Sequence, residues 1–351
     1  MCDKHPLTVG GVEEHVRGLA RQLVARGFEV LVAYRRESSR LLHGIELSTV
    51  RADLDLFKLK KLIKCVGPDL VHAHYSFNWL PLLAVVAADQ LGVASVVTSH
   101  SVLPGYDQGG LSHLFSLTPH RPLLSKARAL ISVSKAVDLL MSRMAGPRVR
   151  RSVIPNAVDT DKYAPSAEAS LEPLVLYVGR LVYRKGVHVL LHAFKEVVRE
   201  EGDARLVVVG GGYLAPFLKT LASKLGLDGK VVFKGVVSEE SKASLYREAW
   251  VVAVPTLYAE GFGIVAAEAM ASGAPVVASR VGGLKEVVEH EATGLLVKPN
   301  SPRELSMALT SLIQDRSLRR RLSAKARARA LEAYSWNEVA ERIVNTYLSL
   351  N

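Results

Sequence analysis

The stretch PTLYAEGFGIVAAE, residues 255–268, decides the fold. The apolar segment 250–254 before it has the composition of a buried strand. After Gly261 and Gly263, a run rich in Ala and Val predicts a helix. The free N–H groups and the positive dipole end at a helix N-terminus favour a bound anion. A strand, a glycine turn and a helix in this order therefore predict an α/β protein with an anion site.

Two glutamates bracket this turn. Glu260 stands at the start of the helix and Glu268 follows it by roughly 12 Å along the helix axis, at 1.5 Å per residue. A carboxylate accepts two hydroxyl donors well, so each glutamate is suited to hold one sugar. The alternative is that Glu260 only pairs with the helix dipole and that Glu268 is solvated. The backbone amides at the turn would hold phosphates; they belong to Gly261, Phe262, Gly263 and Ile264.

A second basic motif follows another predicted strand, 174–178. The strand ends in Gly179, and Arg180 and Lys185 stand on either side of the turn into the next helix. There they can clamp a diphosphate, Arg in bidentate fashion and Lys as a point charge. A merely basic helix start is disfavoured by the helix dipole, so a bound anion is the better explanation.

The end of the predicted strand 230–234 supplies the remaining candidates for binding the phosphate-bearing sugar compound, the donor. Gly235 and Val237 follow it, and their backbone groups are placed to read a nucleotide base. The glycines 210–212 after strand 205–209 predict a close backbone approach, without the full dinucleotide fingerprint.

The first half opens on Gly10 and Gly11, which precede an amphipathic helix that ends at Gly27. In an alternating α/β fold a strand should stand before these glycines. The nine residues MCDKHPLTV do not have the pattern of a buried strand. We therefore expect the chain to begin after its own first strand: either its start is assigned too late, or the N-terminal sheet is short of a strand.

Histidines gather at the predicted ends of two strands. His72 and His74 end one strand, and His100 and Ser101 end the next. Ligands of open α/β sheets bind at this edge. We therefore assign His74, His100 and Ser101 to a second binding site, for the molecule that would accept the sugar (the acceptor), and expect His100 to be the most important of them. A lone histidine is more often a structural residue, but three at one edge favour a site. No zinc is expected, because no cysteine or acidic cluster accompanies them.

The 351 residues predict two domains. We place the acceptor-binding domain at 1–155, with a final helix 335–351 packed back on it, and the donor-binding domain at 156–334. The net charge of +11 favours phosphate-bearing partners, either nucleotides or anionic lipid, and no nucleic-acid module is present. Two cysteines and no long apolar run indicate a cytoplasmic protein, and the few Asn and Gln residues hint at a thermophile.

Two further patterns have alternative readings. The segment 51–66, where lysines alternate with apolar residues, predicts a surface helix that is either solvated or in peripheral contact with an anionic membrane. The basic run 316–329 predicts a solvated face. The triplets Asp53/Asp55 and Asp159/Asp161 are not taken as metal sites, because Asp-x-Asp is frequent by chance.

The chain resembles the family 4 glycosyltransferases, which have the GT-B fold of two Rossmann-like domains facing across a cleft and transfer sugars with retention. The matching motifs run from residue 10 to 297 in family order: GGVEEH, HAHYSFNW, TSHS, ISVSK, VIPNAVD, YVGRLVYRKG, AEGFGIVAAE and GGLKEVVEHEATGLLV. The first half is most similar to the catalytic subunit of the phosphatidylinositol N-acetylglucosaminyltransferases.

The resemblance implies roles for individual residues. Arg180 and Lys185 would hold the diphosphate, Glu260 the donor sugar and Glu268 the ribose. Gly11 would allow the phosphates to approach, and His100 would lie in the reaction centre.

The predicted reaction moves a hexosyl group from a nucleoside diphosphate sugar to a hydroxyl of a lipid-linked or glycan acceptor. We expect no cofactor and no metal, because cations and a helix N-terminus neutralise the leaving diphosphate. The alternatives are another GT-B enzyme, such as a sugar-nucleotide epimerase or phosphorylase, and a non-catalytic nucleotide-sugar-binding subunit.

Overall fold

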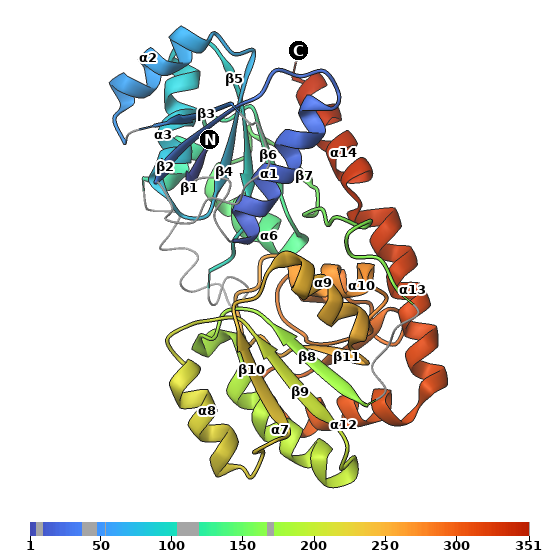
Figure 1. Cartoon of the computed structure of the whole chain (residues 1–351). Helices are drawn as coiled ribbons and strands as arrows, with labels where there is room; N and C mark the ends of the chain where they lie inside the picture. The colour runs from blue at the N-terminus through green and yellow to red at the C-terminus, as the bar shows by residue number, and fades with distance from the viewer. Residues whose placement is uncertain (5–9, 37–47, 53, 104–118, 167–171, 351) are drawn as a thin grey trace. The chain divides into compact units, whose positions relative to one another are not determined.

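A computed structural model of the chain describes residues 1–4, 10–36, 48–52, 54–103, 119–166 and 172–350. Its contacts divide the chain into two compact units (Figure 1). The first unit contains Met1–Ala157 and Trp336–Asn351, and the second contains Val158–Ser335. These divisions lie beside the boundaries expected at 155 and 335, and helix α14 (Trp336–Leu348) belongs to the first unit.

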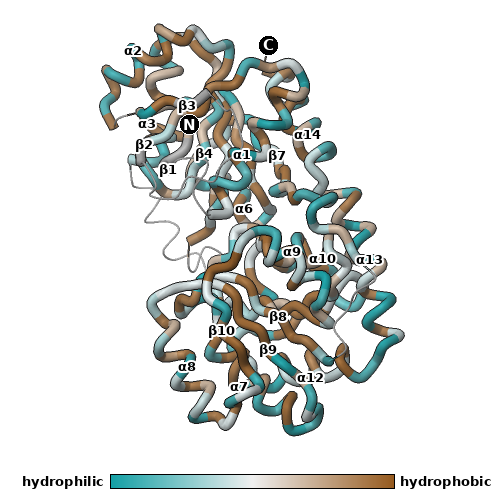
Figure 2. Tube along the Cα trace, viewed as in Figure 1, coloured by the Kyte–Doolittle hydropathy of each residue, from teal (hydrophilic) through white to brown (hydrophobic). Residues whose placement is uncertain are grey.

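The second unit is a six-stranded parallel sheet in the order β10-β9-β8-β11-β12-β13. Its strands are short and apolar, as expected where both faces of a parallel sheet are covered by helices, and Figure 2 shows β8 and β9 as hydrophobic segments. In chain order, the strands are β8 (Leu174–Val178), β9 (Arg205–Val209), β10 (Val231–Gly235), β11 (Val251–Val254), β12 (Val276–Ser279) and β13 (Gly294–Val297). The sheet reverses its direction of growth between β8 and β11.

Helices connect these strands and cover the sheet. They are η1 (Tyr183–Lys185), α7 (Val187–Glu200), α8 (Ala215–Lys224), α9 (Glu239–Glu248), α10 (Ile264–Ala271), α11 (Leu284–Val287), α12 (Pro302–Gln314) and α13 (Arg316–Tyr334). Local capping explains several helix starts: Ser301 caps α12, and Asp315 caps α13 by accepting a hydrogen bond from the N–H of Leu318 at 2.9 Å. The apolar faces of α7 and α12 pack with β8, β9 and β11 in one core.

The basic face of α13 differs from the expectation of a solvated surface. The guanidinium of Arg319 stacks over the ring of Trp250, 4.0 Å from its centroid. Arg327 donates to three backbone carbonyls, those of Thr160, Tyr163 and Ala271, at 2.9, 3.0 and 2.7 Å. Arg319 also donates to the carbonyls of Leu312 and Ile313, at 2.6 and 3.1 Å. The prediction was wrong for these two arginines, because backbone carbonyls at the ends of neighbouring segments accept their N–H groups.

The first unit contains two sets of parallel strands, β1-β2-β3 and β4-β5-β6-β7. Met1 joins them, because its amino group donates to the carbonyl of His72 at 2.5 Å and its carbonyl accepts from the N–H of His74 at 3.0 Å. The strands are β1 (Cys2–Lys4), β2 (Leu31–Arg36), β3 (Ser48–Arg51), β4 (Leu70–Tyr75), β5 (Ala94–Ser99), β6 (Ala129–Ser132) and β7 (Arg150–Val153).

The expectation that the first strand is missing was therefore wrong. Residues Cys2–Lys4 pair in parallel with β2, with Cys2 opposite Tyr34. Three residues are too few to show the period-2 or continuous apolar pattern by which strands are recognised in sequence. The first helix, α1 (Gly11–Val24), follows β1 in the chain, as the glycine pair predicted.

The other described helices of this unit are α2 (Leu56–Val66), α3 (Trp79–Gln90), α5 (His120–Leu124), α6 (Lys135–Ala145) and α14. Helix α14 packs its Val339 and Ile343 into a core shared with Leu19 and Leu23 of α1. Gly18 is required there, because a Cβ at this position would lie 1.9 Å from the ring of Trp336. No helix among the described residues is long and apolar enough to cross a membrane.

Candidate functional site

A small pocket in the second unit opens between the carboxyl ends of β8 and β11. It is lined by Tyr177 and Val178 of β8, Val254 of β11, and the loop and helix residues Lys185, Thr256, Glu260, Gly263, Ile264 and Val265. This is the point where the strand order reverses, and open α/β sheets bind their ligands at such switch points. The two stretches singled out in the sequence therefore meet at the edge where a ligand is expected.

Lys185 and Glu260 form the polar centre of this pocket. The Nζ of Lys185 lies 2.5 Å from Oε2 of Glu260, and the hydroxyl of Thr256 donates to the same oxygen at 3.3 Å. The Glu260 side chain is 13% exposed. Burial raises the pKa of Glu260, but the Lys185 ammonium and the Arg184 guanidinium outweigh it and leave the pKa below its ordinary value. Glu260 is thus a buried carboxylate held ionised by its neighbours.

Arg184 and Thr256 are members of this cluster that the sequence reading missed. Arg184 lies 3.8 Å from the carboxylate of Glu260 and donates to the carbonyl of Ala259 at 3.3 Å. Ala259 adopts a left-handed backbone with φ of 55°, which costs about 1–2 kcal/mol in a residue with a Cβ. Their positions in the sequence could have identified them, because Arg184 directly precedes Lys185 and Thr256 lies in the loop that follows the apolar strand 250–254.

The turn into α10 presents backbone groups to the pocket. Gly263 caps the helix with φ of 100°, and no side chain caps the first turn. The first N–H groups of the helix, at Ile264 and Val265, therefore have no intrahelical acceptor, and both residues line the pocket. Gly261 and Phe262 are buried beside them, with the Phe262 ring against Tyr334 at 5.5 Å.

Arg180 lies at the same sheet edge without joining the cluster. Its side chain is exposed, and its guanidinium has no ion-pair partner among the residues that the structure describes. Its carbonyl accepts a hydrogen bond from the Tyr177 hydroxyl at 3.0 Å. The structure thus brings Lys185 to Glu260 and leaves Arg180 available to an incoming anion.

Glu268 is neither solvated nor unpaired. Its two carboxylate oxygens are held by Lys242 at 3.0 Å and by the hydroxyl of Tyr246 at 2.8 Å, both from α9. The Glu268 side chain is 3% exposed. The solvated alternative is excluded, and a ribose that reached Glu268 would have to share or replace these two partners.

The neighbouring glycine loops pack backbone on backbone. A Cβ at Gly210 would lie 1.9 Å from the carbonyl of Gly179, which explains why two glycines face each other there. The N–H of Gly210 donates to the carbonyl of Gly235 at 2.7 Å. Gly235 is exposed with φ of 69° and Val237 is half-buried, so both stand at the sheet edge as expected.

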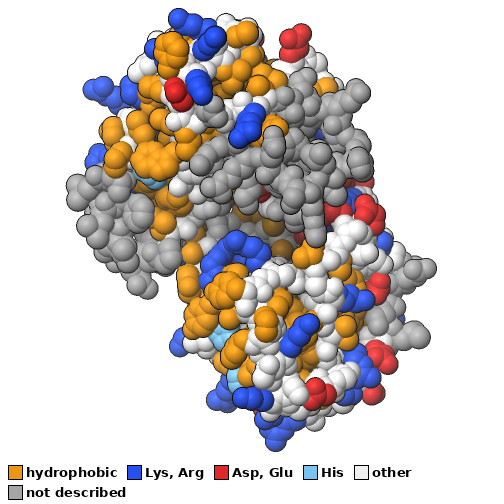
Figure 3. Space-filling view, turned by 60° about the vertical axis from the view of Figure 1, so that its left-hand side comes forward, with side chains coloured by type: hydrophobic (Ala, Val, Ile, Leu, Met, Phe, Trp, Pro, Cys, Tyr) orange, Lys and Arg blue, Asp and Glu red, His pale blue; other side chains and the backbone are white. Residues whose placement is uncertain are grey.

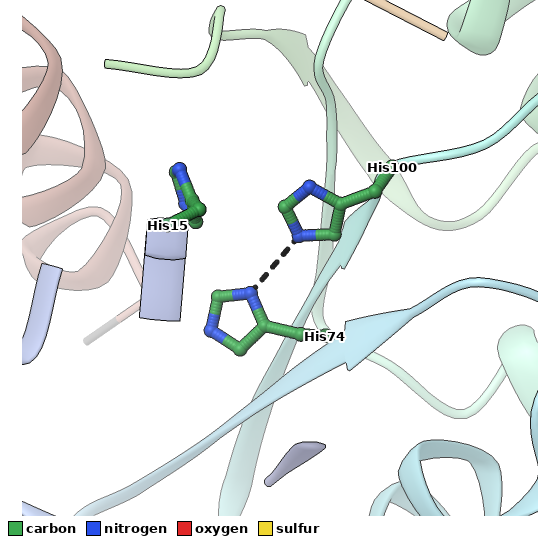
Figure 4. A group of neighbouring side chains, drawn as sticks. All are labelled: His15, His74 and His100. Carbon is green, nitrogen blue, oxygen red and sulfur yellow. Dashed lines mark hydrogen bonds between the residues drawn. The ribbon is translucent and has the colours of Figure 1, made fainter. Parts of the chain in front are cut away.

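Four histidines cluster in the first unit. His72 lies inside β4 and not at the strand end where the sequence reading had placed it. His74 lies near the end of β4 and His100 follows β5, while His15, which the sequence reading missed, projects from α1 (Figure 4). His74 Nδ1 and His100 Nε2 are hydrogen-bonded at 3.1 Å. The His15 ring lies 5.0 Å from the His100 ring, centroid to centroid. No sequence pattern indicated a role for His15, because the amphipathic pattern of α1 explains a polar residue at that position.

Burial favours the neutral form of these histidines. Burial lowers the pKa of His15 to about 4. Burial, and after it the mutual repulsion that the clustered histidines would have if protonated, also lowers the pKa of His74 and His100 well below the ordinary value. Ser101 is half-buried next to His100, and Gly11 is exposed at the first position of α1.

Family models match both units. The model described as Glycosyltransferase Family 4 matches residues 9–162, and the one described as Glycosyl transferases group 1 matches residues 159–329. A protein of Methanocaldococcus jannaschii named an uncharacterized glycosyltransferase is 31% identical and aligns over 97% of this chain and 95% of its own length. The chain is a family 4/group 1 glycosyltransferase.

Other relatives of this glycosyltransferase have more specific names. The D-inositol 3-phosphate glycosyltransferase of Nocardia farcinica is 34% identical over 96% of this chain and 84% of its own. The sucrose-phosphate synthase of Thermosynechococcus elongatus superposes with a TM-score of 0.83 at 25% identity, covering 99% of this chain and 98% of its own. Anabaena HepE, solved in complex with UDP-glucose, superposes with a TM-score of 0.81 at 22% identity over 99% and 98% of the two chains. The fold is GT-B, with two Rossmann-like domains.

Proposed function

We propose that this glycosyltransferase moves a hexosyl group from a nucleoside diphosphate sugar to a hydroxyl acceptor, with retention of the anomeric configuration. The observation that carries the proposal is the Lys185–Glu260 pair beside the uncapped turn of α10, at the switch point of the second unit. Anabaena HepE, which has the same fold and was solved with UDP-glucose bound, supports a donor of this kind.

In this scheme the donor binds to the second unit. Lys185, Arg180 and the N–H groups at the start of α10 neutralise the diphosphate as it leaves. Glu260 accepts hydroxyl groups of the hexose, Glu268 accepts those of the ribose, and the backbone at Gly235 and Val237 contacts the base. Gly11 of the first unit allows the phosphates to approach.

The acceptor side is assigned to His74, His100 and Ser101 of the first unit. The resemblance to the retaining family 4 enzymes suggests that the acceptor hydroxyl attacks on the face from which the diphosphate departs and gives its proton to the diphosphate, without a carboxylate nucleophile. The relatives named D-inositol 3-phosphate glycosyltransferases support a polyol hydroxyl as acceptor. A lipid-linked or glycan hydroxyl has the same chemistry. We infer that the reaction uses neither a metal nor a cofactor.

A thermal-shift panel of UDP-, GDP- and ADP-sugars tests the donor. One base should raise the melting temperature more than the others, because a ligand that binds only the folded state at about 100 times its Kd adds about 2.7 kcal/mol of stability. The Lys185→Ala variant should respond less. If no nucleotide sugar shifts the wild type, the donor assignment fails. Isomerised sugar formed without acceptor, or dependence on free phosphate, would identify an epimerase or a phosphorylase.

We further propose that α2 contacts an anionic membrane surface from the cytoplasmic side. Asp55 caps this helix, Leu59 and Ile63 are buried, and Phe57 is 79% exposed. Lysines accompany it on the surface, and Figure 3 shows Lys and Arg side chains beside hydrophobic ones at the end of the unit that holds α2. A basic face with an exposed aromatic suits a lipid headgroup layer.

Charge reversal of Lys60, Lys61 and Lys64 to Glu should weaken binding to vesicles of mixed neutral and anionic lipid by more than about 100-fold, since each lysine near the surface contributes about 1 kcal/mol and each glutamate adds repulsion. Co-sedimentation measures it. The matched control reverses three exposed cations of α13, Arg320, Arg321 and Lys325, and should keep binding. Equal losses in the two triple variants would show that only net charge matters.

A further inference from the structure

Three of the buried histidines offer ring nitrogens to a common point in the first unit. One nitrogen each from His15, His74 and His100 lie within 4.8 Å of one another, and all three side chains are buried. They come from a helix, the end of a strand and the residue after a strand, so three separate elements hold them (Figure 4). We propose that these histidines bind a divalent transition metal of the zinc class.

The distances fit a metal with nitrogen ligands. The bond between zinc and a histidine nitrogen is about 2.0–2.1 Å, so two ligands of a tetrahedral ion lie roughly 3.3 Å apart. His74 Nδ1 and His100 Nε2 are already 3.1 Å apart. The metal would replace the hydrogen bond between these two nitrogens. The His15 nitrogen lies within 4.8 Å of both, so it would have to approach by up to about 1.5 Å to complete a three-histidine set with an open fourth position.

Unsatisfied polar atoms point to a missing partner. Both ring nitrogens of His15 and the Nδ1 of His100 are buried without a hydrogen-bond partner among the described residues. A buried polar group without a partner is costly, and a metal would satisfy His15 directly. The Oδ1 of Asn156 is also buried without a hydrogen-bond partner among the described residues, and its side chain is near enough to His100 to act against the lowering of the His100 pKa by burial. When a metal binds Nε2 of His100, the Nδ1–H of the same ring can donate a hydrogen bond to Oδ1 of Asn156. Metal-bound histidines commonly donate their second ring N–H to an oxygen in this way.

His72 is excluded from the ligand set although its ring stacks on His74 at 4.4 Å. Its two nitrogens are already engaged, Nδ1 with the hydroxyl of Tyr347 at 2.6 Å and Nε2 with that of Thr98 at 2.7 Å. His72 therefore supports the ring of His74 without binding the metal.

The consequence for activity rests on the proposed function. Because His100 is assigned to the acceptor side, a metal that occupies it would block the reaction, so the ion is an inhibitor rather than a cofactor. Metal binding itself does not depend on that assignment and is measured separately.

The binding experiment titrates Co²⁺ and Zn²⁺ into the full chain without a purification tag. His188 and His192, one turn apart on α7, form a second pair that can hold such ions, so all measurements use the His192→Gln background. We expect one ion per chain and the intense visible absorption of four-coordinate Co²⁺. Adding His15→Gln should weaken binding more than about 100-fold, since even outer-partner changes cost roughly 10–100-fold.

The results separate the possibilities. Loss of all binding in His192→Gln, or only the weak absorption of six-coordinate Co²⁺, would overturn the proposal, and neither readout depends on how well His15→Gln folds. Equal affinity with and without His15 would also overturn it. Saturation by Zn²⁺ with no change in sugar transfer would leave the metal site standing and remove its assignment as an inhibitor.

Discussion

Replacing Lys185 with alanine should lower kcat for sugar transfer by about 10²–10³-fold, the usual cost of removing one group that stabilises developing charge. In the structure the ammonium lies 2.5 Å from Glu260, at the mouth of the pocket lined by the first turn of α10. Under the proposed function, the leaving diphosphate would then lose one of the cations assigned to neutralise it. Steady-state kinetics with EDTA present measures the effect and excludes a compensating metal.

The same substitution also leaves a buried carboxylate behind. Glu260 would keep only Thr256 and the more distant Arg184, at 3.8 Å, and the pKa of Glu260 should rise because the cation that most lowers it is gone. The double variant Lys185→Ala/Glu260→Gln removes this complication. If the orphaned carboxylate alone caused the loss, the double variant would recover; we expect it to remain inactive.

Lys195 supplies the matched control, because it is an exposed lysine on α7 away from the pocket. Lys195→Ala should keep wild-type kcat. Wild-type turnover in Lys185→Ala would contradict the assignment of Lys185, and complete loss of wild-type activity on adding EDTA would contradict a reaction without metal.

The sheet of the second unit could be predicted almost strand by strand. Strands β8 and β9 begin and end where the sequence placed them, and β10 and β11 lie within one residue of their predicted bounds. Strands buried on both faces are nearly continuous apolar runs, which makes them recognisable in sequence. The close approach of the glycine loops was also predictable, since Gly210 has room for nothing larger than a hydrogen atom against Gly179.

The partners of the site residues could not be predicted in this way. Glu268 is paired with Lys242 and Tyr246 of α9, 26 and 22 residues earlier in the chain. No local pattern records that α9 and α10 lie side by side. His15 was missed for the same reason. The amphipathic pattern of α1 predicts the helix, but it does not show which strand ends lie next to His15.

Position 186 connects the stability of the second unit to its chemistry. Gly186 begins α7 with φ of 71°, and a Cβ there would lie 2.0 Å from the carbonyl oxygen of Pro255. A hydrogen bond from the N–H of Leu257 to the carbonyl of Arg184, at 2.7 Å, joins the loop before α7 to the loop after β11. This close contact sets Lys185 against the loop that carries Glu260.

Gly186→Ala should therefore destabilise the second unit by about 2–5 kcal/mol, combining about 1–2 kcal/mol for a left-handed alanine with about 1–3 kcal/mol for forcing the two loops apart. Gly226→Ala isolates the first contribution, because Gly226 has φ of 74° and nothing within 4 Å of the added Cβ. Differential scanning calorimetry should show a much larger fall in melting temperature for Gly186→Ala. Its remaining folded fraction should also lose activity, because Lys185 moves with the loop. Equal effects of the two substitutions would mean that the contact with Pro255 is unimportant and that backbone conformation alone requires glycine at 186.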